Sequence, residues 1–211
     1  MSSDRRPILV LVGPPGAGKT TVGRVLARRL RVEFTDVDAL IVERAGKPIA
    51  DIFLQDGEPA FRALEREVVA EALTVTDGVL ALGGGSVMAD ETRARLRGHR
   101  VVHLQVGLSD GLRRTGMSTA RPLLAGVNPR ATFKALLDAR APLYREVATH
   151  EIDTVRRSAN QVARAVLEAI GEVPASAPAD PLDPDDPLDV PTPFGAHAAG
   201  ATPLPDPTAR H

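Results

Sequence analysis

Short apolar runs alternate along the chain with longer stretches in which apolar residues recur every three or four positions. The runs are typical of strands buried in a parallel sheet, and the recurring spacing is typical of helices that pack on one face. Strands separated by helices predict an α/β fold, with a doubly wound, five-stranded and mainly parallel sheet flanked by helices. Five strands are expected, at residues 8–12, 32–35, 78–82, 101–106 and 149–154. Helices are expected at residues 19–30, 38–43, 49–56, 59–73, 131–144 and 160–170, and another should begin at Asp110 and break at Gly116.

This pattern stops near Val173, where proline and aspartate become frequent. Ten of the 18 prolines lie in residues 173–211, and proline lacks the backbone donor that helices and sheets need. The few apolar residues there show no period, which is typical of low-complexity, disordered segments. The sequence therefore predicts one domain at residues 1–172 and a disordered Pro/Asp-rich C-terminal tail at residues 173–211.

Composition and charge narrow the classes of function. The chain has no cysteine, which excludes disulfides, thiol catalysis and cysteine metal sites. Residues 1–171 carry 25 basic and 20 acidic side chains, a mild excess that suits an anionic ligand but not nucleic acid. No apolar run approaches the ~18 residues of a membrane helix, and no targeting signal is apparent. We expect a cytoplasmic monomer with no nucleic-acid or membrane partner.

Residues 13–20 read GPPGAGKT and match the phosphate-binding pattern G-x-x-x-x-G-K-[ST]. The motif lies between the first predicted strand and the first predicted helix, as a P-loop requires. Its glycines let N–H groups wrap a polyphosphate, and the helix N-terminus adds a positive dipole end. Lys19 should reach the β- and γ-phosphates, and Thr20 should ligate magnesium. The motif predicts nucleotide binding but not the reaction, since switches, motors and kinases share it.

Two aspartates, Asp36 and Asp38, follow the second predicted strand. In an extended chain, residues two apart project to the same side, so both carboxylates would lie at the carboxyl end of the sheet. Open α/β sheets bind ligands there, and two like charges suggest a shared cation or divided roles. The alternative is that one aspartate caps the next helix, a role that Asp38 could combine with ligand binding.

Further motifs follow in order: Phe61-Arg62-x-x-Glu65, Gly83-Gly84-Gly85, Arg121-Pro122-Leu123-Leu124 and Arg140-x-Pro142-x-Tyr144. Together with the P-loop and the two aspartates, this order resembles the shikimate kinases, and the resemblance covers roughly residues 7–171. It implies a P-loop kinase fold with a mobile lid. It also implies ATP-dependent phosphorylation of the 3-hydroxyl of shikimate, with Mg²⁺ as cofactor, in chorismate and aromatic amino-acid biosynthesis.

The resemblance implies a role for each motif. The catalytic residues would be Lys19, Asp38 and Arg121. The magnesium side would comprise Thr20 and Asp36. ATP would be bound by Gly16, Ala17, Gly18, Lys19, Thr20, Thr21, Arg114, Arg121 and Arg157. Shikimate would be bound by Asp38, Arg62, Gly83, Gly84, Gly85 and Arg140.

Some of these roles have an alternative. Arg62 and Glu65 could form an ordinary surface ion pair, whereas the resemblance implies that Arg62 holds the acceptor carboxylate and Glu65 orients it. Arg114 and Arg157 could be exposed, solvated arginines rather than neighbours of the nucleotide base. Residues 113–126 are interpreted as the lid, although Met117-Ser118-Thr119 matches no pattern that we can assign.

Two other functions remain open from the sequence. The first is another small-molecule kinase, such as a gluconate or nucleoside monophosphate kinase, although Arg62, Gly83–Gly85 and Arg140 suit a compact carboxylate better. The second is a nucleotide switch or an inactive binding module, against which the intact Lys19 and Asp38 argue. An ADP-release assay over several acceptors would separate the three.

Overall fold

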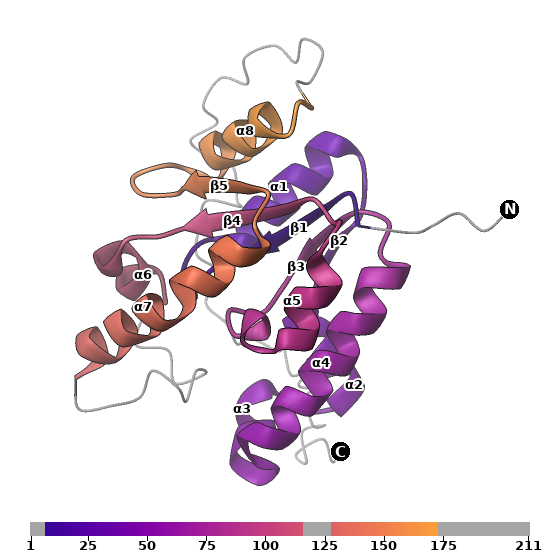
Figure 1. Cartoon of the computed structure of the whole chain (residues 1–211), viewed down its shortest axis with the longest axis vertical. Coiled ribbons are helices and arrows are strands. Elements are labelled where there is room, and N and C mark those ends of the chain that lie inside the picture. The colour runs from indigo at the N-terminus through magenta and orange to yellow at the C-terminus, as the bar shows by residue number, and fades with distance from the viewer. Residues whose placement is uncertain (1–6, 116–127, 173–211) are drawn as a thin grey trace, which may run out of the picture. The chain divides into compact units, whose positions relative to one another are not determined.

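The computed structural model describes residues 7–115 and 128–172. Five strands form one sheet in these residues, in the order β2-β3-β1-β4-β5, and every neighbouring pair is parallel (Figure 1). The predicted doubly wound sheet is therefore confirmed. The strands are β1 (Leu9–Val12), β2 (Phe34–Asp36), β3 (Val79–Ala81), β4 (Val101–Gln105) and β5 (His150–Asp153).

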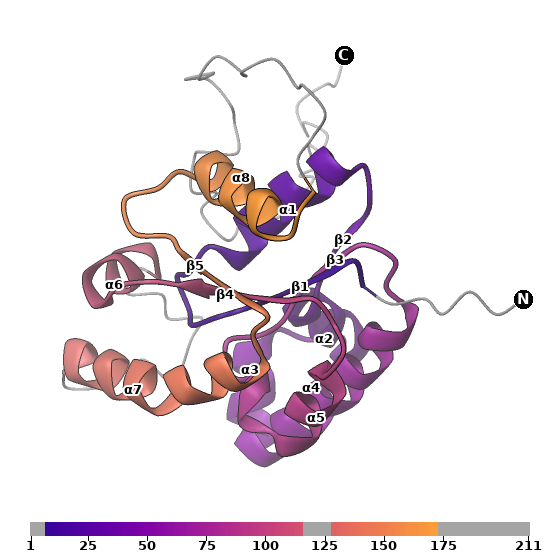
Figure 2. The same ribbon diagram turned by 45° about the horizontal axis from the view of Figure 1, so that its top comes forward.

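Helices cover both faces of the sheet (Figure 2). One face packs against α1 (Lys19–Leu30) and α8 (Ala159–Ala169). The other face is covered by α2 (Val37–Ala45), α3 (Ile49–Gln55), α4 (Gly57–Val75), α5 (Asp90–Leu96) and α7 (Pro129–Val147). Two further elements are α6 (Leu108–Thr115) and the short 3₁₀ helix η1 (Ser86–Met88).

The central strand β1 explains the continuous apolar run in the sequence. Leu9 and Leu11 lie in the core shared with α1 and α8, whereas Val10 and Val12 lie in the core of the opposite face. All four residues are at most 1% exposed. Because successive strand residues point to opposite faces, a strand covered on both faces must be apolar at every position.

The element boundaries differ from the sequence prediction in instructive places. The first helix matches residue for residue, but α4 begins two residues earlier than predicted, at Gly57. The helix α7 also begins early, because Asn128 caps it by accepting a hydrogen bond from the Ala131 N–H at 3.1 Å. Both η1 and α5 were missed. The helix α5 buries only Thr92 and Leu96, which is too little for a visible period.

Two predicted segments fall outside the described residues. The tail at residues 173–211 lies outside them, as does most of the predicted lid. The helix expected from Asp110 to Gly116 is confirmed as α6, which begins two residues earlier and continues through Thr115, so residues 113–115 of the predicted lid are helical. Within the described part of the chain, no helix combines the length and apolar character needed to cross a membrane.

Because all five strands run in the same direction, their carboxyl ends meet at one edge of the sheet. The P-loop follows β1, Asp36 ends β2, and residues 83–85 follow β3. The segment Thr154–Arg157 follows β5 at the same edge. The P-loop, Asp36, Gly83–Gly85 and Arg157 are therefore gathered where open α/β sheets bind ligands.

Candidate active site

The phosphate loop depends on backbone angles that favour glycine. Gly13, Gly16 and Gly18 have φ values of 146°, 77° and 87°. A Cβ at Gly13 would stand 2.4 Å from the carbonyl oxygen of Leu104, and one at Gly16 would stand 2.7 Å from that of Gly111. The loop thus curls tightly between β4 and α6 and leads into the N-terminus of α1. Backbone N–H groups and the helix dipole there suit a bound polyphosphate.

The ammonium group of Lys19 is held inside this loop. Its Nζ donates hydrogen bonds to the carbonyl oxygens of Gly13, at 2.8 Å, and Pro14, at 3.1 Å. Both acceptors are neutral, and hydrogen bonds between a cation and an anion are considerably stronger. A phosphate oxygen that enters the loop would therefore meet an ammonium group that is already positioned to bind it.

Asp36 connects the second strand to the phosphate loop. Its Oδ2 accepts a hydrogen bond from the Thr20 hydroxyl at 2.8 Å, and its Oδ1 accepts one from the Asp38 backbone N–H at 3.0 Å. Asp36 is therefore the N-cap of α2 as well as the partner of Thr20. The expectation that Asp36 and Asp38 share one extended segment was wrong, because α2 begins at Val37 and places Asp38 in its first turn.

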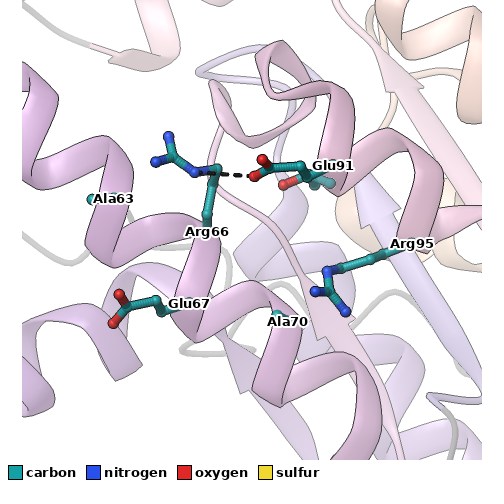
Figure 3. Close-up of a pocket in the computed structure, with 7 residues that line it drawn as sticks. Ala63, Arg66, Glu67, Ala70, Glu91 and Arg95 are labelled. Atoms are coloured by element: carbon teal, nitrogen blue, oxygen red, sulfur yellow. Dashed lines mark ion pairs between the residues drawn. The ribbon is translucent and has the colours of Figure 1, made fainter.

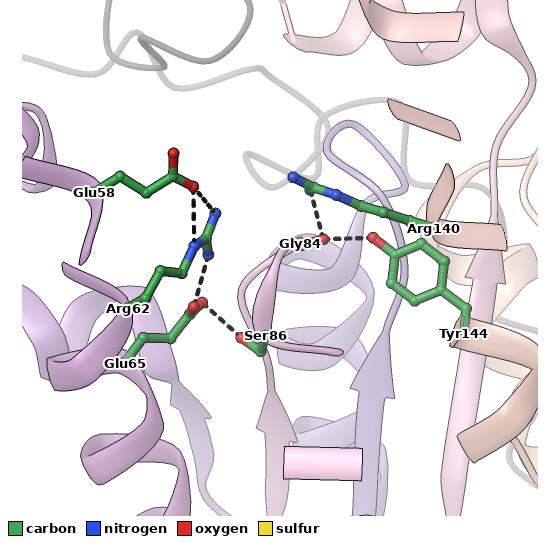
Figure 4. Close-up of polar contacts among 7 residues, drawn as sticks. All are labelled: Glu58, Arg62, Glu65, Gly84, Ser86, Arg140 and Tyr144. Carbon is green, nitrogen blue, oxygen red and sulfur yellow. Dashed lines mark hydrogen bonds and ion pairs between the residues drawn. The ribbon is translucent and has the colours of Figure 1, made fainter. Parts of the chain in front are cut away.

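A chain of polar contacts links α4 to the segment after β3 (Figure 4). Arg62 Nη1 donates to Glu65 Oε2 at 2.7 Å, and the Ser86 hydroxyl donates to Glu65 Oε1 at 2.8 Å. The Glu65 side chain is only 5% exposed and that of Arg62 is 18% exposed, so this is not the surface ion pair that the sequence left open. Arg62 also contacts Glu58 through Nε and Nη2.

The three consecutive glycines let other groups approach the backbone closely. A Cβ at Gly83 would stand 2.8 Å from Glu65 Oε1, 2.9 Å from Asp38 Oδ1 and 3.1 Å from Ser86 Oγ. A Cβ at Gly85 would stand 2.5 Å from Arg62 Nη1. Two carboxylates and a guanidinium therefore gather around this loop, and side chains on it would displace them.

The guanidinium of Arg140 reaches the same loop from α7. Its Nη1 and the Tyr144 hydroxyl both donate to the Gly84 carbonyl oxygen, at 2.8 Å and 2.5 Å (Figure 4). Burial raises the pKa of Tyr144 to about 12, so the phenol keeps the proton that it donates. The Tyr144 ring stacks on His103, with centroids 4.9 Å apart. Burial lowers the pKa of His103, although its hydrogen bond to Glu151 acts in the opposite direction.

The phosphate loop of residues 13–20 contacts the loop of residues 83–85, which we call the glycine loop. A Cβ at Gly84 would stand 3.0 Å from Pro15 Cδ. Arg62 and Arg140 extend towards the glycine loop from α4 and α7, on either side of it (Figure 4). A small anionic molecule held between these guanidinium groups would therefore lie beside the phosphate loop.

Two of the remaining predicted site residues, Arg114 and Arg157, bond to Thr154 rather than to the glycine loop. Arg114 lies in α6, where it donates to the Thr154 hydroxyl at 3.2 Å and to the Thr154 carbonyl oxygen at 3.0 Å. It is exposed, as the alternative expected, and these two bonds also hold it to Thr154. Arg157 is exposed just after β5, in the same neighbourhood, and its backbone N–H bonds to the Thr154 carbonyl oxygen at 3.3 Å. Arg121 lies outside the described residues.

Among the residues that contribute to these contacts, Glu58, Ser86 and Tyr144 had no role in the sequence analysis. Glu58 fell outside the predicted helix, so its position four residues before Arg62 carried no weight. Ser86 offered no signal beyond following the glycines. Tyr144 belonged to the motif of Arg140, and its place one turn further along α7 could have suggested a shared target.

A separate hollow of about 230 Å³ lies between α4 and α5 (Figure 3). Its charged lining includes Arg66 and Glu91, whose Nε and Oε2 atoms form an ion pair at 3.3 Å. No predicted site residue lines it, so it lies apart from the contacts described above. The lining residues are Ala63, Arg66, Glu67, Ala70, Glu91, Thr92 and Arg95.

Comparison with known proteins identifies a family. The family model described as shikimate kinase matches residues 15–171. The shikimate kinase of Saccharopolyspora erythraea is 69% identical over 148 residues, which cover 70% of this chain and 85% of the relative. That of Thermobifida fusca is 55% identical over 171 residues, covering 81% of this chain and 97% of the relative. The solved shikimate kinase of Acinetobacter baumannii, in complex with shikimate, is 41% identical with a TM-score of 0.76, covering 79% of this chain and 94% of its own.

Proposed function

The chain belongs to the shikimate kinase family, and from that premise we propose how its residues divide the reaction. It is a phosphotransferase that moves the γ-phosphate of ATP to the 3-hydroxyl of shikimate, giving ADP and 3-phosphoshikimate. This reaction belongs to the shikimate pathway, which leads to chorismate and the aromatic amino acids. Neither a nucleotide switch nor a kinase for another acceptor accounts for relatives as similar as these.

This division of roles among the residues is supported by one observation, the contact between the phosphate loop and the glycine loop at Pro15 and Gly84. An acceptor carboxylate gripped by Arg62 and Arg140 would hold the shikimate ring against Gly83–Gly85. The ring hydroxyls would then face the end of the phosphate loop. Positioning of this kind supplies most of the catalysis in phosphoryl transfer, because the transition state asks little covalent chemistry of the protein.

On the phosphate side, backbone N–H groups of residues 16–21 would bind the ATP phosphates. Lys19 would exchange the carbonyl oxygens of Gly13 and Pro14 for β- and γ-phosphate oxygens. Its positive charge would then stabilise the negative charge that gathers during transfer. We further propose that Arg121 contacts the transferring phosphate, and that Arg114 and Arg157 lie near the base.

The residues beside the phosphate loop fit Mg²⁺. The Thr20 hydroxyl and an Asp36 carboxylate oxygen lie 2.8 Å apart at the loop, and oxygen donors are what this ion prefers. Thr20 would ligate the ion directly, and Asp36 would act through its water shell. Bound there, Mg²⁺ would neutralise phosphate charge. Asp36 also keeps Asp38 in place, because the same carboxylate caps α2.

On the acceptor side, Asp38 would orient the 3-hydroxyl and take its proton as the bond to phosphorus forms. Its Oδ1 lies beside Gly83, next to Glu65, which Arg62 neutralises. A hydroxyl is too weak an acid to ionise early, and the transition state is loose, so orientation is the larger part of this role.

The direct test is ADP release by the purified full chain with Mg²⁺ and ATP, with shikimate added or omitted. Shikimate should stimulate ADP release strongly, and the product should carry phosphate on the 3-hydroxyl by ³¹P NMR. Gluconate and nucleoside monophosphates serve as control acceptors. Equal stimulation by gluconate, or none by shikimate, would refute the proposal.

We also propose that residues 1–172 are sufficient for activity and that the enzyme is a cytoplasmic monomer. The tail is too rich in proline and aspartate to supply a core. A chain ending at Glu172 should keep its kcat and both KM values within about twofold, and its Tm should be unchanged. Sedimentation of the full chain should give the mass of one chain. A large fall in Tm on truncation, or the mass of a dimer, would contradict these points.

A further inference from the structure

The guanidinium of Arg62 is surrounded on most of its edges. Nη1 is bonded to Glu65, and the Nη1–Nη2 end lies against Gly85, where a Cβ would stand 2.5 Å from Nη1 and 2.9 Å from Nη2. One flat face lies over the Phe61 ring, with Cζ 5.2 Å from its centroid. The edge that remains is the one formed by Nε and Nη2.

That remaining edge is occupied by Glu58. One oxygen, Oε1, accepts from Nε at 3.3 Å and from Nη2 at 3.2 Å. Both distances exceed the 2.7–2.9 Å usual for a hydrogen bond between opposite charges. The Glu58 side chain is 48% exposed, against 5% for Glu65. Of the two carboxylates on Arg62, Glu58 is therefore the weakly held one, and water can replace it at little cost.

A guanidinium binds a carboxylate in two parallel hydrogen bonds along one of two edges, Nε–Nη2 or Nη1–Nη2. The second edge is covered by Gly85 and Glu65. An incoming carboxylate must therefore take the first edge, which Glu58 occupies. We propose that Glu58 is an internal competitor for the acceptor carboxylate, displaced from Arg62 each time an acceptor binds. This rests on the proposed role of Arg62 in binding that carboxylate.

Such a competitor has a definite effect on the reaction. It orients Arg62 and compensates its charge in the empty site, and it weakens acceptor binding by the free energy needed to displace it. Because it leaves before phosphoryl transfer, it should affect the acceptor KM and not kcat. Removing the Glu58 charge should lower the KM for shikimate about two- to fivefold, which is the range expected for one exposed ion pair.

The test compares Glu58→Gln with Glu71→Gln in the full chain. Glu71 is a matched control, because it lies on the same helix, is 53% exposed and pairs with an arginine, Arg44, that has no part in the site. Glu58→Gln should lower the shikimate KM two- to fivefold and leave kcat and the ATP KM unchanged. Glu71→Gln should alter none of the three. Calorimetric titration should show the same gain in shikimate affinity, and no gain for the uncharged methyl ester of shikimate.

An unchanged or raised shikimate KM in Glu58→Gln would overturn the proposal, because Glu58 would then be neutral or would assist binding. An equal gain for the methyl ester would also overturn it, because the competition would not concern the carboxylate. Arg62→Lys in the same assay separates this inference from its premise. If Arg62→Lys leaves the shikimate KM unchanged, the role of Arg62 itself is wrong.

Discussion

The two sides of the proposed site, the phosphate side and the acceptor side, are held together by different means. Lys19 on the phosphate side bonds to carbonyl oxygens five and six residues away in the same loop. On the acceptor side, Ser86 bonds to Glu65 across 21 residues and Arg140 bonds to Gly84 across 56. The phosphate side is thus a local, mainly backbone structure, and the acceptor side exists only once α4, α7 and the sheet have packed.

This difference predicts how each side responds to substitution. Backbone donors cannot be removed by changing a side chain, so the phosphate side is vulnerable mainly at Lys19 and at its glycines. The acceptor side consists of separate side chains, each of which can be altered alone. Variants should therefore separate the two substrates kinetically, and four tests follow from the largest expected effect to the smallest.

The largest effect is expected where the two sides meet, at Asp36 and Asp38. Asp38→Asn should lower kcat by roughly 10²–10⁴-fold, the range for a positioned acid–base group, with little rescue by metal. Asp36→Asn should instead shift the magnesium dependence, with activity partly restored at high Mg²⁺. A magnesium titration of both variants at saturating ATP and shikimate measures this. Rescue of Asp38→Asn alone would show that the roles are reversed.

Lys19→Ala should come next and should act on the phosphate side. Loss of one charge-stabilising donor costs about 10²–10³-fold in kcat, and the fold should persist because the Lys19 ammonium group supplies charge to the phosphate loop rather than packing to the core. Steady-state ADP release measures the loss of kcat, and thermal melting checks that the fold persists. Lys47→Ala is the control, since Lys47 forms an ion pair with Asp56, outside the site. Turnover near that of wild type in a folded Lys19→Ala would refute the nucleotide assignment.

Arg62→Lys and Arg140→Lys should each act on the acceptor side. Lysine cannot form the paired hydrogen bonds of a guanidinium, and a hydrogen bond to a charged group contributes about 1.5–3 kcal/mol. The shikimate KM should rise roughly ten- to hundredfold while the ATP KM changes far less. The shikimate KM is measured at saturating ATP and the ATP KM at saturating shikimate, and the two changes are compared. Equal increases in both would mean that the two sides are not separable as described.

Tyr144→Phe should give the smallest effect. It removes the hydroxyl that bonds to the Gly84 carbonyl oxygen but keeps the ring that stacks on His103. One such hydrogen bond contributes about 0.5–1.5 kcal/mol, so the shikimate KM should rise about two- to tenfold. The ATP KM should stay constant, because Arg140 still holds the loop. A larger change in the ATP KM than in the shikimate KM would show that Tyr144 supports the phosphate side rather than the acceptor side.

The sequence predicted the phosphate side better than the acceptor side, because the contacts of the phosphate side are local in sequence and those of the acceptor side are not. The motif at residues 13–20 is contiguous, and β1 and α1 around it have strong apolar patterns, so strand, loop and helix could all be predicted. The conformation of Asp36 and Asp38 was wrong because α2 begins directly after β2, with no intervening turn for the sequence to reveal. There the alternative of a helix cap applied to Asp36 rather than to Asp38.

On the acceptor side, the residues could be named from a resemblance but their partners could not. Nothing local links Arg140 to the Gly84 carbonyl, because that contact depends on how α7 crosses the sheet. Glu58 was missed through a boundary error of two residues, which hid its position one turn before Arg62 on α4. Small errors at helix ends therefore matter most where charged side chains act in pairs.

The oxygen on which Arg140 and Tyr144 converge belongs to the main chain, so any amino acid at position 84 would still supply it. A substitution at that position would act through the added side chain, whose Cβ would stand 3.0 Å from Pro15 Cδ. For the design of inhibitors, this makes the Gly84 carbonyl oxygen a hydrogen-bond acceptor that no substitution can remove. Resistance to a ligand bound at that oxygen would have to come from the residues around it, several of which we propose bind the enzyme's own substrate.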